Sequence, residues 1–368
     1  MAHEITLLDE IVTQMGTARA WHGLDKQYDL ASMSAPSGAD KAGLNHEVRV
    51  VPLIRIDNSH MTGLYGVYSD KNPDPTPFQT VSENFTPVQP AEHYEWGWKV
   101  AKAIGGTVSS AGTLRGTRHG FVCVELPDSV IDVGGGDKLS RYVSFNISWD
   151  GSYAISAMLW WKRQVCANTT PDSACIDALG DNVLFYERKH KLLGQSAVDA
   201  VVNRLAMIRA EHLEKQRTVL ERLTQAEFSD NLDKLRFCNL MADGQKVLDR
   251  IIRLDEANSS GSFLDKCINA TIDRAAWEKV KIDSANSKAK SILYQLTYGQ
   301  GQDMDTARDT AWGALNGLTY WQNHVAGSDG ERGRKADQDS RFEKVIFGKH
   351  TEATNNATLL LSAIANTR

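Results

Sequence analysis

The sequence predicts an α+β protein in which a central antiparallel β-meander is flanked by helices and followed by a mainly helical C-terminal region. Three observations lead to this fold class: two alternating stretches on either side of Asp150-Gly151, a helical repeat over residues 92–104, and a long helical stripe after residue 188. A period of two indicates strands, whereas recurrence every three to four residues indicates helices. We expect an irregular N-terminal region with short strands (1–90), a helix-plus-meander core (91–187) and a mainly helical region (188–368).

The composition is that of an ordinary globular protein. With 368 residues, 42% hydrophobic and 24% charged, the chain has enough apolar material for a large core. The net charge of -5 provides no overall basic surface, so any role in binding nucleic acid would depend on a local cluster of cations.

The termini and cysteines indicate where the protein resides. The first residues lack the basic start and apolar run of a secretory signal, and no segment approaches the roughly 18 apolar residues that span a bilayer. The five cysteines are scattered and odd in number, which argues against a disulfide framework. We therefore expect a cytoplasmic protein without a membrane partner, with reduced and mostly buried cysteines.

The N-terminal region is rich in turns. The prolines of residues 72–77 exclude a continuous helix and indicate a surface loop. Strands are predicted over 48–56 and 64–68, and Pro52 favours an edge position for the first. Residues 30–42, rich in Ser, Ala and Gly, are expected to form a flexible loop.

The core region begins with a helix over 92–104 that Gly105-Gly106 terminates. Strands at 107–114 and 121–126 flank a turn, and a glycine-rich loop at 132–138 leads to a hairpin. Strands 142–149 and 152–161 alternate around Asp150-Gly151, the pair typical of a type I′ turn with positive φ at both central residues. Residues 107–161 should therefore form one antiparallel sheet that needs one covered face.

The C-terminal region follows a helical period. Val198, Val201, Leu205 and Ile208 form an apolar stripe on a helix that either approaches thirty residues or breaks once. Further helices are predicted over 228–255, 273–298, 306–325 and 354–366, with a polar loop at 326–339.

Three groups of residues have the chemistry to bind nucleic acid, because cations neutralise phosphates and aromatic rings stack on bases. They are Arg115, Arg118 and His119 in the turn between two strands; Trp160, Trp161, Lys162 and Arg163 at the end of the hairpin; and Arg188 and Lys189 before the long helix. Adjacent strand residues face opposite ways, so only one tryptophan can line a groove while the other belongs to the core. Each group also has a purely structural alternative. The first could be a solvent-exposed turn, the second a packed strand with a solvent-exposed end, and the third the solvent-exposed start of a helix.

Enzymatic motifs are weaker. Cys166, Asn168 and His190 include the residue types of a cysteine nucleophile site, but their spacing shows no contact, and a small buried thiol is the alternative. Cys166 and Cys175 lack the close pairing of zinc ligands.

Two further motifs also fall short of a ligand site. Gly134-Gly-Gly136 lacks the Lys-Ser/Thr of a phosphate-binding loop and is interpreted as a mobile loop. Asp172, Asp177 and Asp181 have no histidine partners and are interpreted as solvated. We therefore expect no catalytic residue, cofactor or metal.

The order of several short motifs is similar to that of a known family. The motifs are Ala20-Trp-His-Gly23, Leu64–Tyr68, Phe85–Gln89, Ala111–Gly116, Arg163–Thr169, Arg188–His190 and Thr310–Asn316. Together they resemble the phage/plasmid-like family called domain of unknown function 932. The resemblance implies a mobile-element origin and a prokaryotic host cytoplasm. More distantly, the succession of helix, meander and helix is similar to the core of single-strand annealing proteins, in which a sheet and its hairpin line a groove for DNA.

These observations lead to three hypotheses. The first is a single-stranded DNA-binding protein of a phage or plasmid that assists annealing, recombination or replication, without a cofactor and with a homo-oligomer as one possible form. The second is a protein-interaction module of a mobile element, such as a host-defence antagonist or assembly factor, to which the acidic balance is better suited. The third is an enzyme with an unrecognised site.

Overall fold

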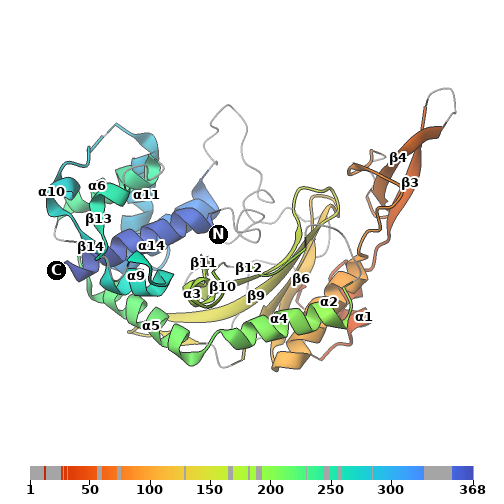
Figure 1. Ribbon diagram of the computed structural model, residues 1–368, viewed down its shortest axis with the longest axis horizontal. Helices are drawn as coiled ribbons and strands as arrows, with labels where there is room; N and C mark the ends of the chain where they lie inside the picture. Colours follow the sequence, from red (N-terminus) through yellow and green to blue (C-terminus); the bar gives the residue numbers. More distant parts are fainter. Residues whose placement is uncertain are drawn as a thin grey trace.

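The molecule is curved, with a central sheet, a projecting β-arm at one end and a helical lobe at the other (Figure 1). This computed structural model describes residues 12–13, 26–27, 29–30, 32–55, 60–72, 76–127, 130–164, 169–180, 183–187, 193–228, 230–243, 248–255, 259–283, 285–326 and 350–367. The predicted α+β class, with a meander followed by a helical region, is confirmed.

The central sheet is an antiparallel meander. Its long strands lie in the order β6 (Thr107–Leu114), β7 (His119–Glu125), β9 (Lys138–Ser148) and β10 (Ile155–Arg163). Short strands extend it: β8 (Ile131–Asp132) pairs with β9, β11 (Thr169–Pro171) and β12 (Val183–Glu187) pair with β10, and β1 (Val12–Thr13) and β2 (Lys26–Gln27) follow β6. The pairing of residues 107–161 in one antiparallel sheet agrees with the sequence prediction.

The hairpin tip differs from the predicted type I′ turn. A loop over residues 149–154 separates β9 from β10, and Gly151 (φ 74°) has a positive φ whereas Asp150 does not. The Asp150 carboxylate organises this wider loop, because Oδ1 accepts hydrogen bonds from the Ser152 amide at 2.9 Å and the Ser148 hydroxyl at 2.7 Å. Side-chain hydrogen bonds of Asp150 therefore stabilise the hairpin tip, in place of the backbone conformation of a two-residue turn.

Helix α2 (Pro90–Ile104) covers one face of the sheet. It begins with a capping box between Gln89 and Glu92 and ends at Gly105, whose φ of 68° is left-handed. Close approach to the sheet depends on Gly97, because an added Cβ there would lie 2.7 Å from Val122 Cγ1.

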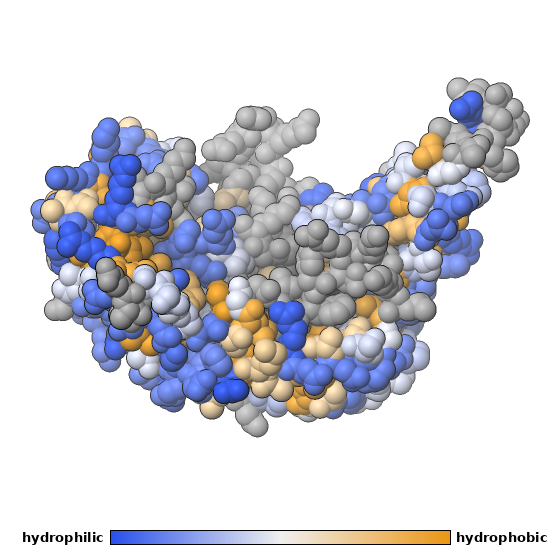
Figure 2. Space-filling model, in the orientation of Figure 1, coloured by the Kyte–Doolittle hydropathy of each residue, from blue (hydrophilic) through white to orange (hydrophobic). Residues whose placement is uncertain are grey.

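Two further helices continue along the same side. The predicted long helix breaks once, into α4 (Gln195–Met207) and α5 (Ala210–Gln225). Val198, Val201 and Ile208 of the predicted stripe are buried, as their spacing indicates. In Figure 2 an apolar patch lies near the middle of the lower edge, close to where Figure 1 shows α4 and α5 meet, with hydrophilic side chains on either side.

The N-terminal region forms the arm and one short helix. Strands β3 (Val48–Ile54), β4 (His60–Ser69) and β5 (Thr80–Val81) make a three-stranded sheet in which β3 is an edge, as Pro52 predicted. The expected flexible loop at 30–42 is wrong in part, since α1 (Ala35–Lys41) forms there with proline in its first turn.

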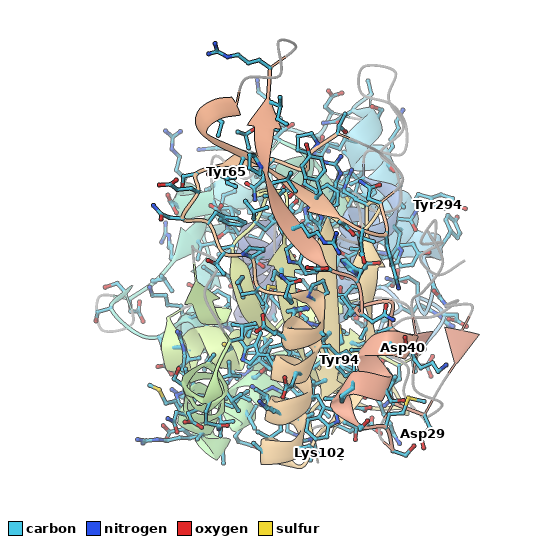
Figure 3. All side chains as sticks on the ribbon, turned by 90° about the vertical axis from the view of Figure 1, so that its right-hand side faces the viewer. Asp29, Asp40, Tyr65, Tyr94, Lys102 and Tyr294 are labelled. Carbon is cyan, nitrogen blue, oxygen red and sulfur yellow. The ribbon has the colours of Figure 1, made fainter. Side chains whose placement is uncertain are left out.

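Helix α1 is held by packing against α2. An added Cβ on Gly38 would overlap the Tyr94 hydroxyl, so the two helices meet closely at this glycine. Figure 3 shows Tyr94 beside the α1 ribbon that carries Asp40. Helix formation here is therefore decided by a tertiary contact that local composition does not reveal.

Helix α3 (Ser173–Leu179) lies within the core region, between β11 and β12. The C-terminal region is helical, as predicted, but in shorter pieces. After α5 its elements are α6 (Asn231–Ala242), α7 (Leu248–Ile251), α9 (Phe263–Asn269), α10 (Arg274–Glu278), α11 (Ser287–Tyr298), α12 (Ala311–Tyr320), the π-helix η1 (Trp321–Val325), α14 (Thr351–Asn366), and the strand pair β13 (Ile252–Arg253) and β14 (Thr271–Ile272). Side-chain caps set several boundaries: Asp230 starts α6, Asn286 starts α11 and Thr310 starts α12. None of the helices within the described ranges has the length and apolarity needed to cross a bilayer.

Replacing Gly97 with valine should lower the free energy of unfolding by about 1–3 kcal/mol, the usual cost of overpacking a core. The added methyl groups would force α2 away from Val122 and Phe145. Urea denaturation followed by circular dichroism measures this change. Gly194→Ala is the control, because nothing lies within 4 Å of its added Cβ; equal losses in both variants would contradict the packing argument.

Candidate functional site

The two faces of the central sheet differ in chemistry. One face, called here the helix face, carries apolar residues such as Val122, Phe145 and Leu159 and packs under α2 and its neighbours. The alternate residues point the other way and form the polar face. This face comprises His119, Phe121, Cys123 and Glu125 on β7, Ser140, Tyr142, Ser144, Asn146 and Ser148 on β9, and Ser156, Met158, Trp160 and Lys162 on β10.

Strand register places the side chains of the polar face in rows. Glu125, Tyr142 and Trp160 are direct partners across three strands. The Tyr142 and Trp160 rings stack with centroids 4.8 Å apart and planes 14° from parallel. A continuous aromatic platform therefore crosses β9 and β10.

Charge on the polar face is concentrated beside this platform. Burial raises the pKa of Glu125, and the nearby Lys162 ammonium partly opposes that increase. Burial also raises the pKa of the Tyr142 phenol well above its usual range, so the ring remains neutral. The platform is thus a neutral stacked pair next to a cation and a carboxyl group.

The polar face is deeply buried. Tyr142, Ser144 and Asn146 are 0% exposed, and all its members except Glu125 are at most 8% exposed. Buried hydroxyl and amide groups are costly unless hydrogen-bonded, and Asn146 Nδ2 donates to Ser144 Oγ at 3.2 Å. A run of serines and asparagine in a central sheet is therefore poorly explained by core packing alone.

The first predicted binding group, the turn between β6 and β7, lies at the hairpin end of the sheet. Arg115 and Arg118 are half-buried, and the Arg118 guanidinium stacks 4.9 Å from the Phe78 ring. His119 is 1% exposed, and its Nε2 forms a 3.0 Å hydrogen bond with Asp150 Oδ1. His119 thus connects this turn to the hairpin tip.

The contact with His119 changes the pKa of the Asp150 carboxyl group. Burial alone would raise the pKa of its carboxyl group. The hydrogen bond and charge of His119, together with hydrogen bonds from Ser152, outweigh burial and hold the pKa of Asp150 well below its usual range. The ionised carboxylate is therefore favoured by the folded state.

The second predicted group, Trp160 to Arg163, is entirely buried at 1–2% exposure. Trp160 and Lys162 belong to the polar face, whereas Trp161 and Arg163 alternate to the other side. The two tryptophans lie on opposite faces of the sheet, as the alternation predicted, but both indoles are buried, so neither lines an open groove. The alternative of a packed strand with a solvated end is wrong, because Lys162 and Arg163 are buried as well.

Arg163 is the anchor of a buried polar cluster. Its Nε donates to Asp137 Oδ1 at 2.7 Å and its Nη2 to Asp137 Oδ2 at 2.6 Å, in a bidentate ion pair. Trp312 Nε1 donates to Asp137 Oδ2 at 2.9 Å, and the Thr306 hydroxyl donates at 3.1 Å. The guanidinium is engaged by protein and not open to a phosphate.

The predicted groups do not converge on one point. The turn at 115–119 and the end of β10 lie at opposite ends of the sheet, since the eight residue steps from Ile155 to Arg163 along β10, at about 3.3 Å each, span roughly 26 Å. Arg188 and Lys189 lie outside the described residues, as do Cys166, Asn168, His190 and Asp181. A ligand that contacts both ends would have to be an extended polymer.

Two carboxylates had a role that the sequence interpretation missed. Asp172, expected to be solvated, is 0% exposed: it caps α3 through the amides of Ala174 and Cys175 and pairs with Arg141 Nε. Its position just before a helix was the available signal. Asp137 follows three glycines with positive φ, which shape the turn that delivers it to Arg163.

The described cysteines, Cys123, Cys175, Cys238 and Cys267, are buried thiols, in agreement with the sequence prediction. Within the described part of the chain, no three His, Cys, Asp or Glu residues are arranged to hold a metal ion.

A family model for a domain of unknown function (DUF932) matches residues 77–347. The chain belongs to this family. The matched region includes the whole polar face and the Asp137–Arg163–Trp312 cluster, but not α1, β3, β4 or α14. No curated protein and no solved structure matches the chain. The family resemblance predicted from the motifs is therefore confirmed.

Breaking the buried ion pair should strongly destabilise this DUF932 protein. Asp137→Asn removes the carboxylate charge while keeping the volume and leaves Arg163 uncompensated in the interior, at a cost of about 3–5 kcal/mol. Chemical denaturation measures the change. Arg217→Ala, which removes an exposed pair with Glu221, should leave the midpoint nearly unchanged. Similar midpoints for all three proteins would refute the anchoring role.

The Asp150 carboxylate should make stability depend on acid pH. Its pKa is lower in the folded than in the unfolded state, so its contribution is present above about pH 4 and is lost as pH falls below that value. Asp150→Asn should flatten this acid limb of the stability curve. Denaturation midpoints between pH 2 and 6 test this, and identical slopes in both proteins would contradict it.

Proposed function

We propose that this protein binds single-stranded DNA along the polar face and assists annealing, recombination or replication of a phage or plasmid in the host cytoplasm. The observation that carries the proposal is the polar face itself: a sheet packed by helices on one side presents hydroxyls, an amide, stacked aromatics and a lysine on the other. Hydroxyl and amide groups are common contacts of phosphate and sugar, and aromatic platforms accept bases in single strands.

The shape of the molecule supports the same location. Helices α2, α4 and α5 lie along the convex side, and the sheet above them spans the bend between the arm and the helical lobe (Figure 1). The polar face is therefore directed toward the inside of the bend. Its two ends, at His119 and at Lys162, are far enough apart to suit several nucleotides of an extended strand.

Burial sets a condition on this proposal. Because Trp160 and Lys162 are each 2% exposed, a DNA strand could contact them only after a rearrangement that opens the polar face. Binding would then depend on the population of an open form, and the apparent affinity would be reduced by the fraction of molecules in that form. The proposal includes self-assembly of the protein into a homo-oligomer on the DNA strand.

A protein-interaction module of a mobile element, such as a host-defence antagonist or assembly factor, is the second candidate. The burial of Lys162 and Arg163 favours it, because it removes two of the predicted phosphate ligands from the surface. The β-arm favours it as well, since Val51, Ile54 and Leu64 are 43%, 56% and 38% exposed there. Exposed apolar side chains on a projecting sheet are typical of contact surfaces.

Fluorescence anisotropy with a labelled single-stranded oligonucleotide, over a series of salt concentrations, separates the two candidates. The DNA proposal expects affinity that falls with salt, and Lys162→Gln should weaken binding and reduce the salt slope by about one phosphate contact. Lys102→Gln is the matched control, because Lys102 lies on α2 at the helix side (Figure 3). Folded protein that shows no binding at low salt would refute the DNA proposal and favour the second candidate.

A further inference from the structure

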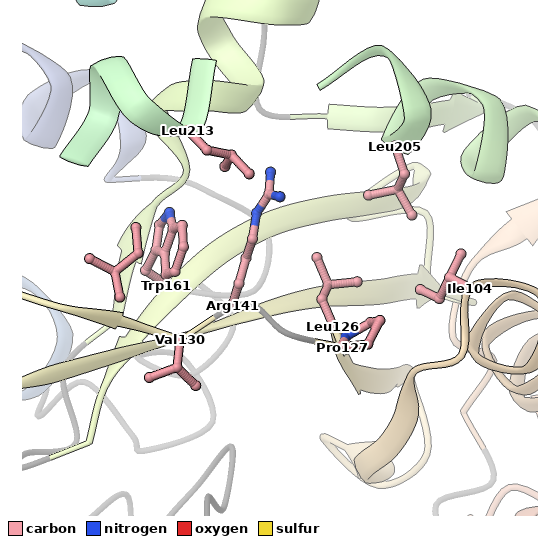
Figure 4. A pocket seen from close by; sticks show the side chains of 9 residues that line it. Ile104, Leu126, Pro127, Val130, Arg141, Trp161, Leu205 and Leu213 are labelled. Atoms are coloured by element: carbon pink, nitrogen blue, oxygen red, sulfur yellow. The ribbon is translucent and has the colours of Figure 1, made fainter. Parts of the chain in front are cut away.

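A cavity of about 240 Å³ lies at the helix face, separate from the polar face. It is lined by the aliphatic side chains of Ile104, Leu126, Pro127, Val130, Ile131, Leu205 and Leu213, and by Arg141 and Trp161. Figure 4 shows the guanidinium of Arg141 extending between Leu205 and Leu213, with Trp161 beside it. The end of α2, the strands β8, β9 and β10 and the α4–α5 junction therefore line one apolar space.

Two buried polar groups of this cavity lack hydrogen-bond partners. Arg141 is 6% exposed and Trp161 is 2% exposed. They are direct partners on β9 and β10, and the Arg141 guanidinium lies over the Trp161 ring, 5.7 Å from its centroid. Arg141 Nε is held by Asp172, but its Nη2 has no partner, and neither has Trp161 Nε1. A buried donor without a partner costs free energy, which a ligand can recover.

The two groups define what a ligand must provide. Both are donors, and none of the nine lining side chains is a hydrogen-bond acceptor. The rest of the lining is aliphatic, so the body of the ligand must be apolar. The volume is below the roughly 300–1,000 Å³ of clefts that hold drug-sized molecules, so the ligand must be small.

We propose that this cavity binds a small aliphatic carboxylate, with its charged head on Arg141 Nη2 and Trp161 Nε1 and its chain among the leucines. The ion pair with Asp172 fixes the guanidinium and leaves an outer edge for the ligand, in a charge-assisted hydrogen bond. Val130 is 52% exposed, so the cavity reaches the surface at this residue and a ligand can enter there. This site is independent of the proposed DNA-binding function.

Octanoate is a suitable probe, with octanol and octylamine as matched compounds of the same chain length. Indole ¹⁵N–¹H spectra of the full chain report on the donor directly, with the Trp161 signal assigned by Trp161→Phe. Octanoate should move this signal and leave that of Trp149, whose indole donates to Val88 O, in place. Calorimetry should give octanoate an affinity at least about ten-fold higher than octanol, the effect of one charge-assisted hydrogen bond, and octylamine should not compete.

Two variants complete the test. Arg141→Gln should abolish the preference for octanoate over octanol; because it also breaks the pair with Asp172, Leu205→Phe serves as a second variant that fills the cavity and keeps the ion pair. Leu205→Phe should lose octanoate binding at least about ten-fold, while Leu232→Phe, at a 49% exposed position on α6, should bind normally. An unmoved Trp161 signal at millimolar octanoate, equal affinity for octanol, or normal binding by Leu205→Phe would each overturn the proposal.

Discussion

The bidentate ion pair between Asp137 and Arg163 is the contact on which the rest of the structure depends. Arg163 is the last residue of β10, and Asp137 lies between the three-glycine turn and the start of β9. The indole of Trp312 on α12 donates a hydrogen bond to the same Asp137 carboxylate. One buried anion thus joins the end of the sheet to the helical lobe, although Asp137 and Trp312 are 175 residues apart. Because an unpaired charge is so costly in the interior, this pairing selects one arrangement of sheet and lobe over its competitors.

Other buried polar contacts fix the remaining parts of the sheet in the same way. His119 and Asp150 join the first turn of the meander to the hairpin tip, and Arg141 and Asp172 tie β9 to the start of α3. Each contact includes at least one residue at or just beyond the end of a strand: His119 and Asp150 in the first, and Asp172 in the second. The aliphatic core supplies the driving force for folding, whereas these directional contacts determine how the ends of the sheet are positioned.

The alternation of side chains along β9 and β10 separates the two proposed sites. Arg141 and Trp161 point to the apolar cavity, while their neighbours Tyr142 and Trp160 form the aromatic platform of the polar face. Two consecutive residues of a strand can thus serve different ligands, because a pleated strand directs them to opposite sides. The sites share a backbone but no side chain, so they can be altered independently.

Local patterns in the sequence determined the meander, the helix after Pro90, the helical stretch after Gly194 and the family, because periodicity and turn residues act over a few neighbours. The period alone does not tell whether the stretch after Gly194 is one helix or two. The same patterns indicated Trp160 to Arg163 as candidate binding residues but did not predict that all four are buried. Burial of Arg163 depends on Asp137 and Trp312, and burial of Asp172 depends on Arg141; these partners are distant in the chain. Only the tertiary structure decided which of these charged residues are buried. A charged side chain is expected to lie in solvent unless a partner of opposite charge lies within hydrogen-bonding distance, and that partner is distant in the sequence.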